Sequence, residues 1–284
     1  MNQPLPAAVS VISHMETHMP LLTTKTLVLL GLAAGISLIM MAATAVQLVT
    51  KKSGWIDTLW TFAVGAGGIA ATLLPAEGAN DTRRLVVGVL VAVWALRLGL
   101  HIANRTHSGD DDPRYAAIQK EHPKDWPVYL FGMLQAQALA AFVLVLAVRY
   151  AAINPAPFPA LLDIVGVVIL VIALIGEGVA DAQVKTFGKT HKGAVANTGL
   201  WKYSRHPNYF FEWLSWCGWA LIALSQPFGW LALLAPIQMY VLLVHVSGIP
   251  PLEKHMLATR GDKFRAYQAR TNAFFPGRPK KEKL

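Results

Sequence analysis

The chain has 284 residues, of which 54% are apolar and only 14% are Asp, Glu, Lys or Arg. This composition is too apolar for an ordinary soluble domain, and several apolar runs approach the roughly 20 residues that a helix needs to cross a bilayer. The net charge is +9, but the basic residues lie in short loops and one tail, so nucleic-acid binding explains the charge poorly. The single Cys217 excludes an intramolecular disulfide, and no Cys/His cluster has the spacing of a metal site.

Seven apolar stretches are expected to form membrane-spanning helices. They cover residues 26–49, 56–75, 85–104, 128–149, 160–184, 207–225 and 228–248. Residues 1–25 show neither a helical period nor a signal-peptide cleavage pattern, and we expect a mobile tail there. The sequence therefore predicts an all-α polytopic membrane bundle over residues 26–278, followed by a basic C-terminal tail over residues 279–284.

The Lys and Arg residues are distributed unevenly between the loops. If the N-terminus lies outside, the inner loops and the C-terminal segment hold 20 of the 25 basic residues, and the outer side holds four. Cytoplasmic loops of membrane proteins carry such an excess. This asymmetry predicts an N-out, C-in topology, with the long loops 105–127 and 185–206 facing the cytosol.

Two glycine patterns occur inside the apolar spans. Gly65-Ala-Gly-Gly-Ile-Ala70 matches a dinucleotide-binding pattern, but it follows no strand, so glycines that allow close helix packing explain it better. Gly31 and Gly35 have the spacing of a helix-packing motif and predict the same kind of contact.

Ionisable residues at membrane depth are the most informative part of the third span. Trp94, Arg97, His101 and Arg105 share one helical face. A guanidinium inside a span nearly always faces the bundle interior or a water-filled cavity. His101 alone is typical of a packing residue, but beside two arginines it becomes a candidate site residue. Asp57, at the start of the second span, is either a helix-dipole partner or a functional carboxylate.

The fifth span carries Glu177, Asp181 and Lys185 at intervals of four residues, so all three lie on one face. Asp181 and Lys185 are in the order that favours an ion pair within a helix. Either the face is a self-paired stripe near the interface, or Glu177, which lies deepest, has a functional partner.

The segment from Asn197 to Glu212 is polar and stands between two apolar ones. Pro207 suits the first turn of a helix, and Ser204 or a neighbour is suited to cap it. The start of that helix would direct its free N–H groups toward Arg205 and His206, which predicts an anion site.

Further acceptors lie near this segment. Asn208 and Glu212 share a face of the predicted helix. The double proline in Ser247-Gly-Ile-Pro-Pro-Leu-Glu-Lys254 breaks the seventh span and restarts a helix with Glu253 in its first turn. The basic and aromatic residues from 257 to 275 predict a surface helix that binds anionic lipid headgroups.

The predicted cytosolic end therefore gathers cations, acceptors and a helix N-terminus. The cations are Arg105, Lys185, Arg205, His206 and Lys254, and the acceptors are Asp181, Asn208, Glu212 and Glu253. A phosphate-bearing nucleotide cofactor needs such groups, and the apolar bundle suits a lipid-like substrate. The residues alone do not choose between a hydride donor and a methyl donor.

The segment Thr198-Gly-Leu-Trp-Lys-Tyr-Ser-Arg-His-Pro-Asn-Tyr-Phe-Phe-Glu212, with Ser247–Lys254 and Trp55-Ile-Asp57, resembles the bacterial steroid 5α-reductase-like integral membrane proteins, a family long catalogued as a domain of unknown function. Sterol reductases and isoprenylcysteine carboxyl methyltransferases look similar in the first segment. The resemblance implies a bacterial inner-membrane bundle of seven helices that holds NADPH with its last three spans and cytosolic loops.

The resemblance also implies roles for individual residues. Asn208 and Glu212 look like the family's cofactor-contacting pair, Asp181 and Lys185 like its acidic and basic pair on the fifth span, and Arg105 like a basic residue of the loop after span three.

The sequence departs from the family at the proton donor. In characterised steroid reductases the donor is a Tyr assisted by a Gln-Glu pair. Here Trp94 occupies the position of the Tyr, and Asp57 lies near the position of the Gln-Glu pair. Phe211 occupies a position where a Gly is usual. Asp57 and His101 are then the best acid candidates.

Three functions follow as hypotheses. The leading one is an NADPH-dependent reductase of a C=C bond in a lipid-like enone or alkene. The alternative is a membrane methyltransferase that uses S-adenosylmethionine, suggested by Arg205-His-Pro-Asn-Tyr209 and Glu253. The third is a non-catalytic lipid-binding protein, and a homo-oligomer is compatible with all three.

Overall fold

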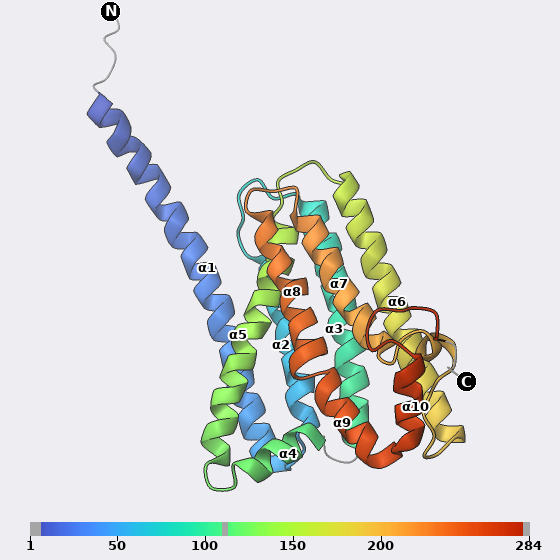
Figure 1. The fold of residues 1–284 in the computed structure, drawn as a ribbon. Coiled ribbons are helices and arrows are strands. Elements are labelled where there is room, and N and C mark those ends of the chain that lie inside the picture. Colours follow the sequence, from blue (N-terminus) through green and yellow to red (C-terminus); the bar gives the residue numbers. More distant parts are fainter. Residues whose placement is uncertain (1–6, 110–112, 281–284) are drawn as a thin grey trace, which may run out of the picture.

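The computed structural model describes residues 7–109 and 113–280, which form helices and loops without strands (Figure 1). The long helices are α1 (Ala7–Thr50), α2 (Gly54–Leu73), α3 (Asp81–Ser108), α5 (Trp126–Ala152), α6 (Leu161–Thr190) and α7 (Pro207–Ala223). The next segment combines the 3₁₀-helix η2 (Gly229–Leu233), α8 (Leu234–Val241) and the π-helical turn η3 (Leu242–Val246). The short helices are α4 (Pro113–Glu121), the 3₁₀-helix η1 (Gly199–Lys202), α9 (Ile249–Arg260) and α10 (Asp262–Arg270).

Six helices of the described chain are long and apolar enough to cross a membrane. The segment predicted at 207–225 forms α7, which has 17 residues and is shorter than these six. It packs against α5 and α6 and buries Trp216, Trp219 and Ile222. The prediction of an all-α polytopic bundle is confirmed, and the chain is an integral membrane protein.

The ends of two predicted spans differ from the structure. Helix α1 begins at Ala7 rather than near residue 26, and it projects beyond the other helices (Figure 1). The seventh span is not one regular helix, because it starts as a 3₁₀-helix and ends in a π-helical turn. The predicted break is present: Ser247 and Gly248 separate this span from α9, whose first turn holds the two prolines.

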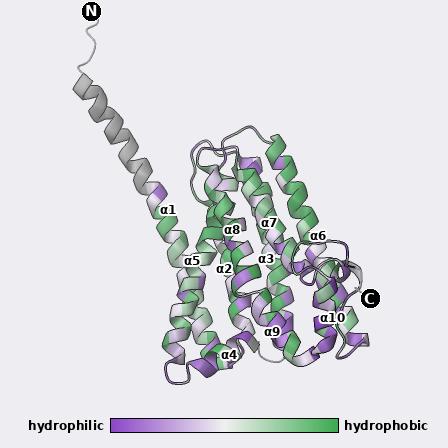
Figure 2. Cartoon of the chain, in the orientation of Figure 1, coloured by the Kyte–Doolittle hydropathy of each residue, from purple (hydrophilic) through white to green (hydrophobic). Residues whose placement is uncertain are grey.

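The two ends of the bundle differ in character. Loops 74–80, 153–160 and 224–228 lie at one end, which we call the loop end. Helices α4, α9 and α10 and the loop 191–206 lie toward the other end, which we call the basic end (Figure 1). Figure 2 shows hydrophilic residues concentrated in α4, α9 and α10, whereas the spans are mostly hydrophobic. The basic loops thus lie together at one end of the bundle, and the N-out, C-in orientation of that end stays a prediction.

Glycines set the distance between α2 and its neighbours. A Cβ atom on Gly65 would overlap Ala95 on α3, and one on Gly67 would press against Val145 on α5. The interpretation of this motif as helix packing is confirmed. The same prediction for Gly31 and Gly35 was wrong, because no neighbouring atom lies within 4 Å of a Cβ built on either residue.

A buried ion pair joins two helices at the loop end. The Arg83 guanidinium on α3 donates to both carboxylate oxygens of Asp163 on α6, over 2.9 and 2.7 Å. Arg83 also donates to the carbonyls of Asn154 and Ala156 over 2.5 and 2.7 Å, and Asp163 accepts the N–H of Ala160 over 2.8 Å. The charges are therefore fully hydrogen-bonded, as buried charges must be.

Candidate functional site

A groove of about 640 Å³ separates α3 from α6, and we call it the α3/α6 groove. It is lined by Val93, Leu96, Arg97, Leu100, His101 and Asn104 of α3 and by Gly178, Asp181, Ala182 and Lys185 of α6. Both helices run toward the basic end, so Asn104 and Lys185 lie nearest that end and Val93 lies deepest. Its apolar side chains are exposed on the outer surface of the bundle, where lipid would contact them.

Arg97 joins the two walls of the groove. Its guanidinium pairs with Glu177, with 2.6 Å between Nη1 and Oε2, and also with Asp181. His101 Nε2 lies 3.7 Å from Asp181 Oδ2. The partner of Asp181 is thus a cation on another helix rather than Lys185 on its own helix. The self-paired stripe was therefore wrong, and a functional role of Glu177 stays a prediction.

The N-terminal half of α7 adds polar groups behind the groove. The Glu212 carboxylate accepts the indole N–H of Trp94 over 2.9 Å and that of Trp216 over 2.8 Å. Asn208 donates to Asp181 over 3.3 Å, while its Oδ1 is buried without a hydrogen-bond partner in the described part of the chain. Buried polar groups are normally paired, so an unpaired oxygen beside a groove points to a ligand.

The charges of this region are not balanced. Glu177, Asp181 and Glu212 supply three carboxyl groups, and Arg97 supplies one guanidinium among them. The surplus negative charge of such a cluster in a low-dielectric interior is offset by protons, by hydrogen-bond donors such as the indoles on Glu212, or by cations. His101 and Lys185 lie closer to the basic end.

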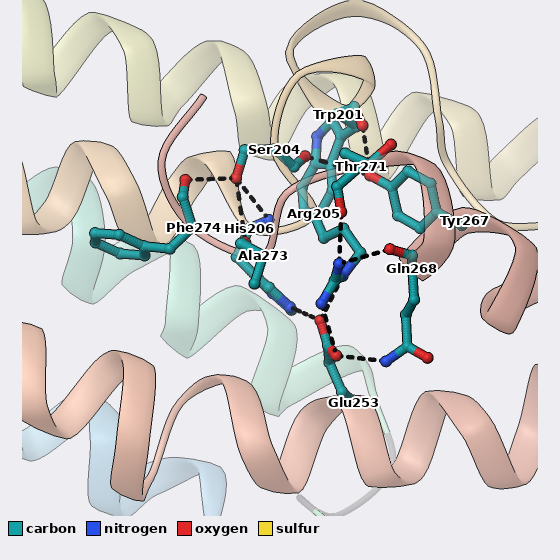
Figure 3. A network of polar contacts seen from close by, with 10 residues as sticks. All are labelled: Trp201, Ser204, Arg205, His206, Glu253, Tyr267, Gln268, Thr271, Ala273 and Phe274. Carbon is teal, nitrogen blue, oxygen red and sulfur yellow. Dashed lines mark hydrogen bonds and ion pairs between the residues drawn. The ribbon is translucent and has the colours of Figure 1, made fainter. Parts of the chain in front are cut away.

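A separate network surrounds Glu253 on α9 (Figure 3). Arg205 donates to its two carboxylate oxygens over 2.7 and 3.1 Å, Gln268 donates over 2.6 Å, and His206 Nε2 lies 2.9 Å from Oε1. Arg205 also donates to the carbonyl of Thr271 over 2.5 Å. Burial lowers the pKa of His206, which keeps the imidazole neutral near pH 7.

The network fastens the C-terminal segment to the start of α7. Ser204 Oγ donates to the carbonyl of Phe274 over 2.8 Å and accepts the N–H of His206 over 3.1 Å. The Tyr267 hydroxyl donates to the carbonyl of Trp201. Arg205 and His206, which were expected to bind an anion, are therefore engaged with the protein itself. Sequence reasoning missed these partners because they lie much later in the chain.

Glu253→Ala is expected to release this segment. The change leaves the Arg205 guanidinium without its carboxylate, so amide hydrogen exchange over residues 271–277 should rise about tenfold or more. Lys254→Ala, at the adjacent exposed position, should leave the exchange unchanged. If Glu253→Ala leaves the amide exchange unchanged but removes the stabilisation by cofactor, Glu253 contacts the cofactor, as the sequence predicted.

Asp57 lies in a third cluster, between α2, α4 and α5. Its carboxylate pairs with Arg114 over 2.5 Å and accepts the Tyr115 hydroxyl over 2.8 Å, and Gln137 lies 3.4 Å from that hydroxyl. Burial and the Asp57 carboxylate raise the pKa of Tyr115 well above its usual value, so the phenol remains a hydrogen-bond donor. Sequence reasoning missed Arg114 and Tyr115, because α4 has no apolar period that would place it against α2.

The predicted site residues thus fall into separate places. His101, Asp181 and Lys185 line the α3/α6 groove, with Asn208 and Glu212 behind it, whereas Arg205, His206 and Glu253 form the network of Figure 3. Tyr209 stacks on His206, with 5.5 Å between the ring centroids. Arg105 is exposed in the last turn of α3, where Asn104 lines the groove instead. Arg97 and Glu177 complete the groove cluster.

Comparison with known proteins gives one family. The family described as "Protein of unknown function (DUF1295)" matches residues 43–271. This match covers the last turns of α1 and every later helix, including the groove and Glu253 with its side-chain partners Arg205, His206 and Gln268. No curated protein and no solved structure matches the chain.

Proposed function

The chain is a membrane protein of the DUF1295 family, and on the basis of its α3/α6 groove we propose that it is an NADPH-dependent reductase of a C=C bond in a lipid-like enone or alkene. The bundle holds ionisable groups at membrane depth, where they are costly unless they serve a ligand or a reaction. The similarity of Thr198–Glu212 to reductases of the steroid 5α-reductase type adds to this argument.

The observation that carries the proposal is the order of polar groups along the groove. Acceptors lie deep, at Glu177 and Asp181, while Lys185 lies toward the basic end. A dinucleotide carries its phosphates between its two nucleosides. With the phosphates at Lys185, the ribose hydroxyls and ring carboxamide of the nicotinamide half would extend toward the deeper acceptors. A volume of about 640 Å³ is within the roughly 300–1,000 Å³ of small-molecule sites.

The residues present fit NADPH in the following way. Lys185 would hold phosphate oxygens, and Asp181 and Asn208 would accept or donate to hydroxyl and amide groups. NADPH supplies hydride when bound. His101 would provide the proton, because it lines the groove and its Nε2 lies 3.7 Å from Asp181. Asp57 is occupied by Arg114 and Tyr115 in the separate cluster near α4.

The apolar wall of the groove suits the second substrate. Val93, Leu96 and Leu100 face outward from α3 and would contact acyl or ring carbons dissolved in the bilayer. The basic end would face the cytosol of a bacterial inner membrane, because its Lys and Arg residues satisfy the positive-inside rule there. A cytosolic cofactor and a membrane-dissolved substrate would then meet at one site.

Transfer of a methyl group from S-adenosylmethionine is the second candidate. The excess of carboxyl groups over Arg97 favours a ligand with a positive charge, and the sulfonium of this cofactor carries one. The segment Arg205–Tyr209 resembles isoprenylcysteine carboxyl methyltransferases. In the structure, however, Arg205 is held by Glu253 and Thr271, which leaves it less suited to a carboxylate of the cofactor.

Thermal unfolding of the purified protein in detergent tests both candidates. NADPH at saturating concentration is expected to raise the midpoint, and S-adenosylmethionine is not. Lys185→Ala should weaken NADPH binding about tenfold, because it removes a charged phosphate partner. Lys189→Ala, one turn later on α6 and exposed, is the matched control and should bind like the wild type.

The contrary outcomes are equally definite. Stabilisation by S-adenosylmethionine alone would favour the methyltransferase over the reductase. No response to either cofactor would favour a lipid-binding protein without catalysis. Equal NADPH affinity of Lys185→Ala and wild type would show that the cofactor does not contact Lys185 in the groove.

A further inference from the structure

A second cavity, of about 240 Å³, lies between the η1 region and the C-terminal segment, and we call it the C-terminal cavity. It is lined by Asn197, Lys202, Tyr267, Arg270, Thr271, Pro279 and Lys280. None of these residues lines the α3/α6 groove. The cavity is therefore a separate place, and the proposed reductase does not use it.

Hydrogen bonds between distant segments hold the walls of the C-terminal cavity in position. The N–H of Lys280 donates to the carbonyl of Arg270 over 2.9 Å, which folds the last described residues back onto the end of α10. The N–H of Gly277 donates to the carbonyl of Tyr203 over 2.9 Å, and Tyr267 donates to Trp201. These bonds fix two segments that lie more than sixty residues apart, so the cavity is built before any ligand arrives.

The charge of the lining is entirely positive. Lys202 comes from η1, Arg270 from the end of α10 and Lys280 from the C-terminal segment, so three cations from three elements surround one small space. No lining residue in the described part of the chain is acidic. Bringing the ammonium groups of Lys202 and Lys280 to one space costs free energy, which an anion between them would offset.

We propose that the C-terminal cavity binds a phosphate group. A phosphate presents several acceptor oxygens in different directions, which suits ammonium and guanidinium donors on different walls better than a single planar carboxylate does. The amide of Asn197 adds a neutral donor. The volume of about 240 Å³ admits a phosphate with a small substituent and no large molecule.

Two sources present this chemistry at the basic end of the bundle. One is the headgroup of an anionic phospholipid, since the cavity lies beside helices that emerge from the membrane. The other is a soluble phosphate compound. The proposal concerns the phosphate group that both contain, and the experiment separates the two sources.

The test uses the full-length protein in neutral detergent and compares wild type with the double variant Lys202→Ala/Lys280→Ala. The control, Lys254→Ala/Lys263→Ala, removes the same charge from exposed positions on α9 and α10. One arm measures binding of phosphatidylglycerol by native mass spectrometry, with diacylglycerol as the lipid that lacks phosphate. The other arm titrates inorganic phosphate against chloride at equal ionic strength and follows thermal unfolding.

We expect the wild type and the control to bind phosphatidylglycerol but not diacylglycerol, and the double variant to bind it at least about tenfold more weakly. Binding of phosphatidylglycerol alone identifies a lipid-headgroup site, and saturable stabilisation by inorganic phosphate as well identifies a site for a soluble phosphate compound. The proposal is overturned if the two double variants lose affinity equally, because general surface charge then explains the binding. It is also overturned if no probe binds the wild type.

Discussion

Arg97→Met is expected to destabilise the protein by about 3–5 kcal/mol, because it leaves buried carboxylates without their cation. Arg97 is the only cation that pairs with both Glu177 and Asp181 among the described residues. The same change should abolish stabilisation by NADPH, since the two carboxylates of α6 would then repel each other and α3 would lose its ionic contact with α6 across the groove. The measurement is unfolding in mixed detergent, with and without the cofactor.

Arg105→Met is the matched control for Arg97→Met. It removes the same side chain from the same helix, but at an exposed position outside the groove, where substitutions usually change stability by less than about 0.5 kcal/mol. Combining Arg97→Met with Glu177→Gln should restore part of the lost stability, because one unpaired charge is removed. Equal stability of Arg97→Met and wild type would mean that the cluster is not the polar centre of the bundle.

Asp163→Ala is expected to have a similar cost at the loop end, about 3–5 kcal/mol, without altering ligand binding. It leaves the Arg83 guanidinium, which is 0% exposed, without its carboxylate. It also removes the acceptor of the Ala160 N–H at the start of α6. The dissociation constant of NADPH, measured well below the unfolding temperature, should remain that of the wild type, because Asp163 lies far along α6 from Asp181.

Asp81→Ala provides the comparison for Asp163→Ala. Asp81 also lies in the first turn of a helix and also faces an arginine, with 3.3 Å to Arg84, but its side chain is 94% exposed. Exposed pairs of this kind contribute about 0–1 kcal/mol. If both aspartates prove equally dispensable, the buried pair does not anchor α6. If Asp163→Ala weakens NADPH binding in the folded protein, the two ends of α6 are coupled.

The sequence predicted the architecture because each span carries its own signal. Long apolar runs fix the helices, and helical spacing correctly placed Arg97, Asp181 and Lys185 on faces that meet at one groove. Contacts across the groove could not be predicted from the sequence in the same way. The i,i+4 spacing suggested Lys185 as the partner of Asp181, and only tertiary packing shows that Arg97 takes this place.

Other residues could not be placed from local pattern at all. Arg205 contacts Glu253, Gln268 and Thr271, which follow it by several dozen residues. Sequence periodicity does not predict contacts between segments so far apart. The same applies to Tyr115, which reaches Asp57 from a short helix of mixed composition.

Phe211 and Gly176 show how a large and a small residue fit together between α7 and α6. Phe211 stands where the resemblance predicted a glycine on α7, and its ring packs against Gly176 of α6. A Cβ atom on Gly176 would overlap that ring, so only glycine fits there at this spacing of the two helices.

The attachment of the C-terminal segment to Ser204 and Arg205 has a consequence for biogenesis. The main-chain carbonyls that receive these side chains belong to Thr271 and Phe274, which follow the last span and α10. A nascent chain that has inserted every span still lacks them, so the entrance of α7 reaches its final form only after this later segment has been synthesised. Docking of that segment, rather than membrane insertion, is then the event that completes the basic end.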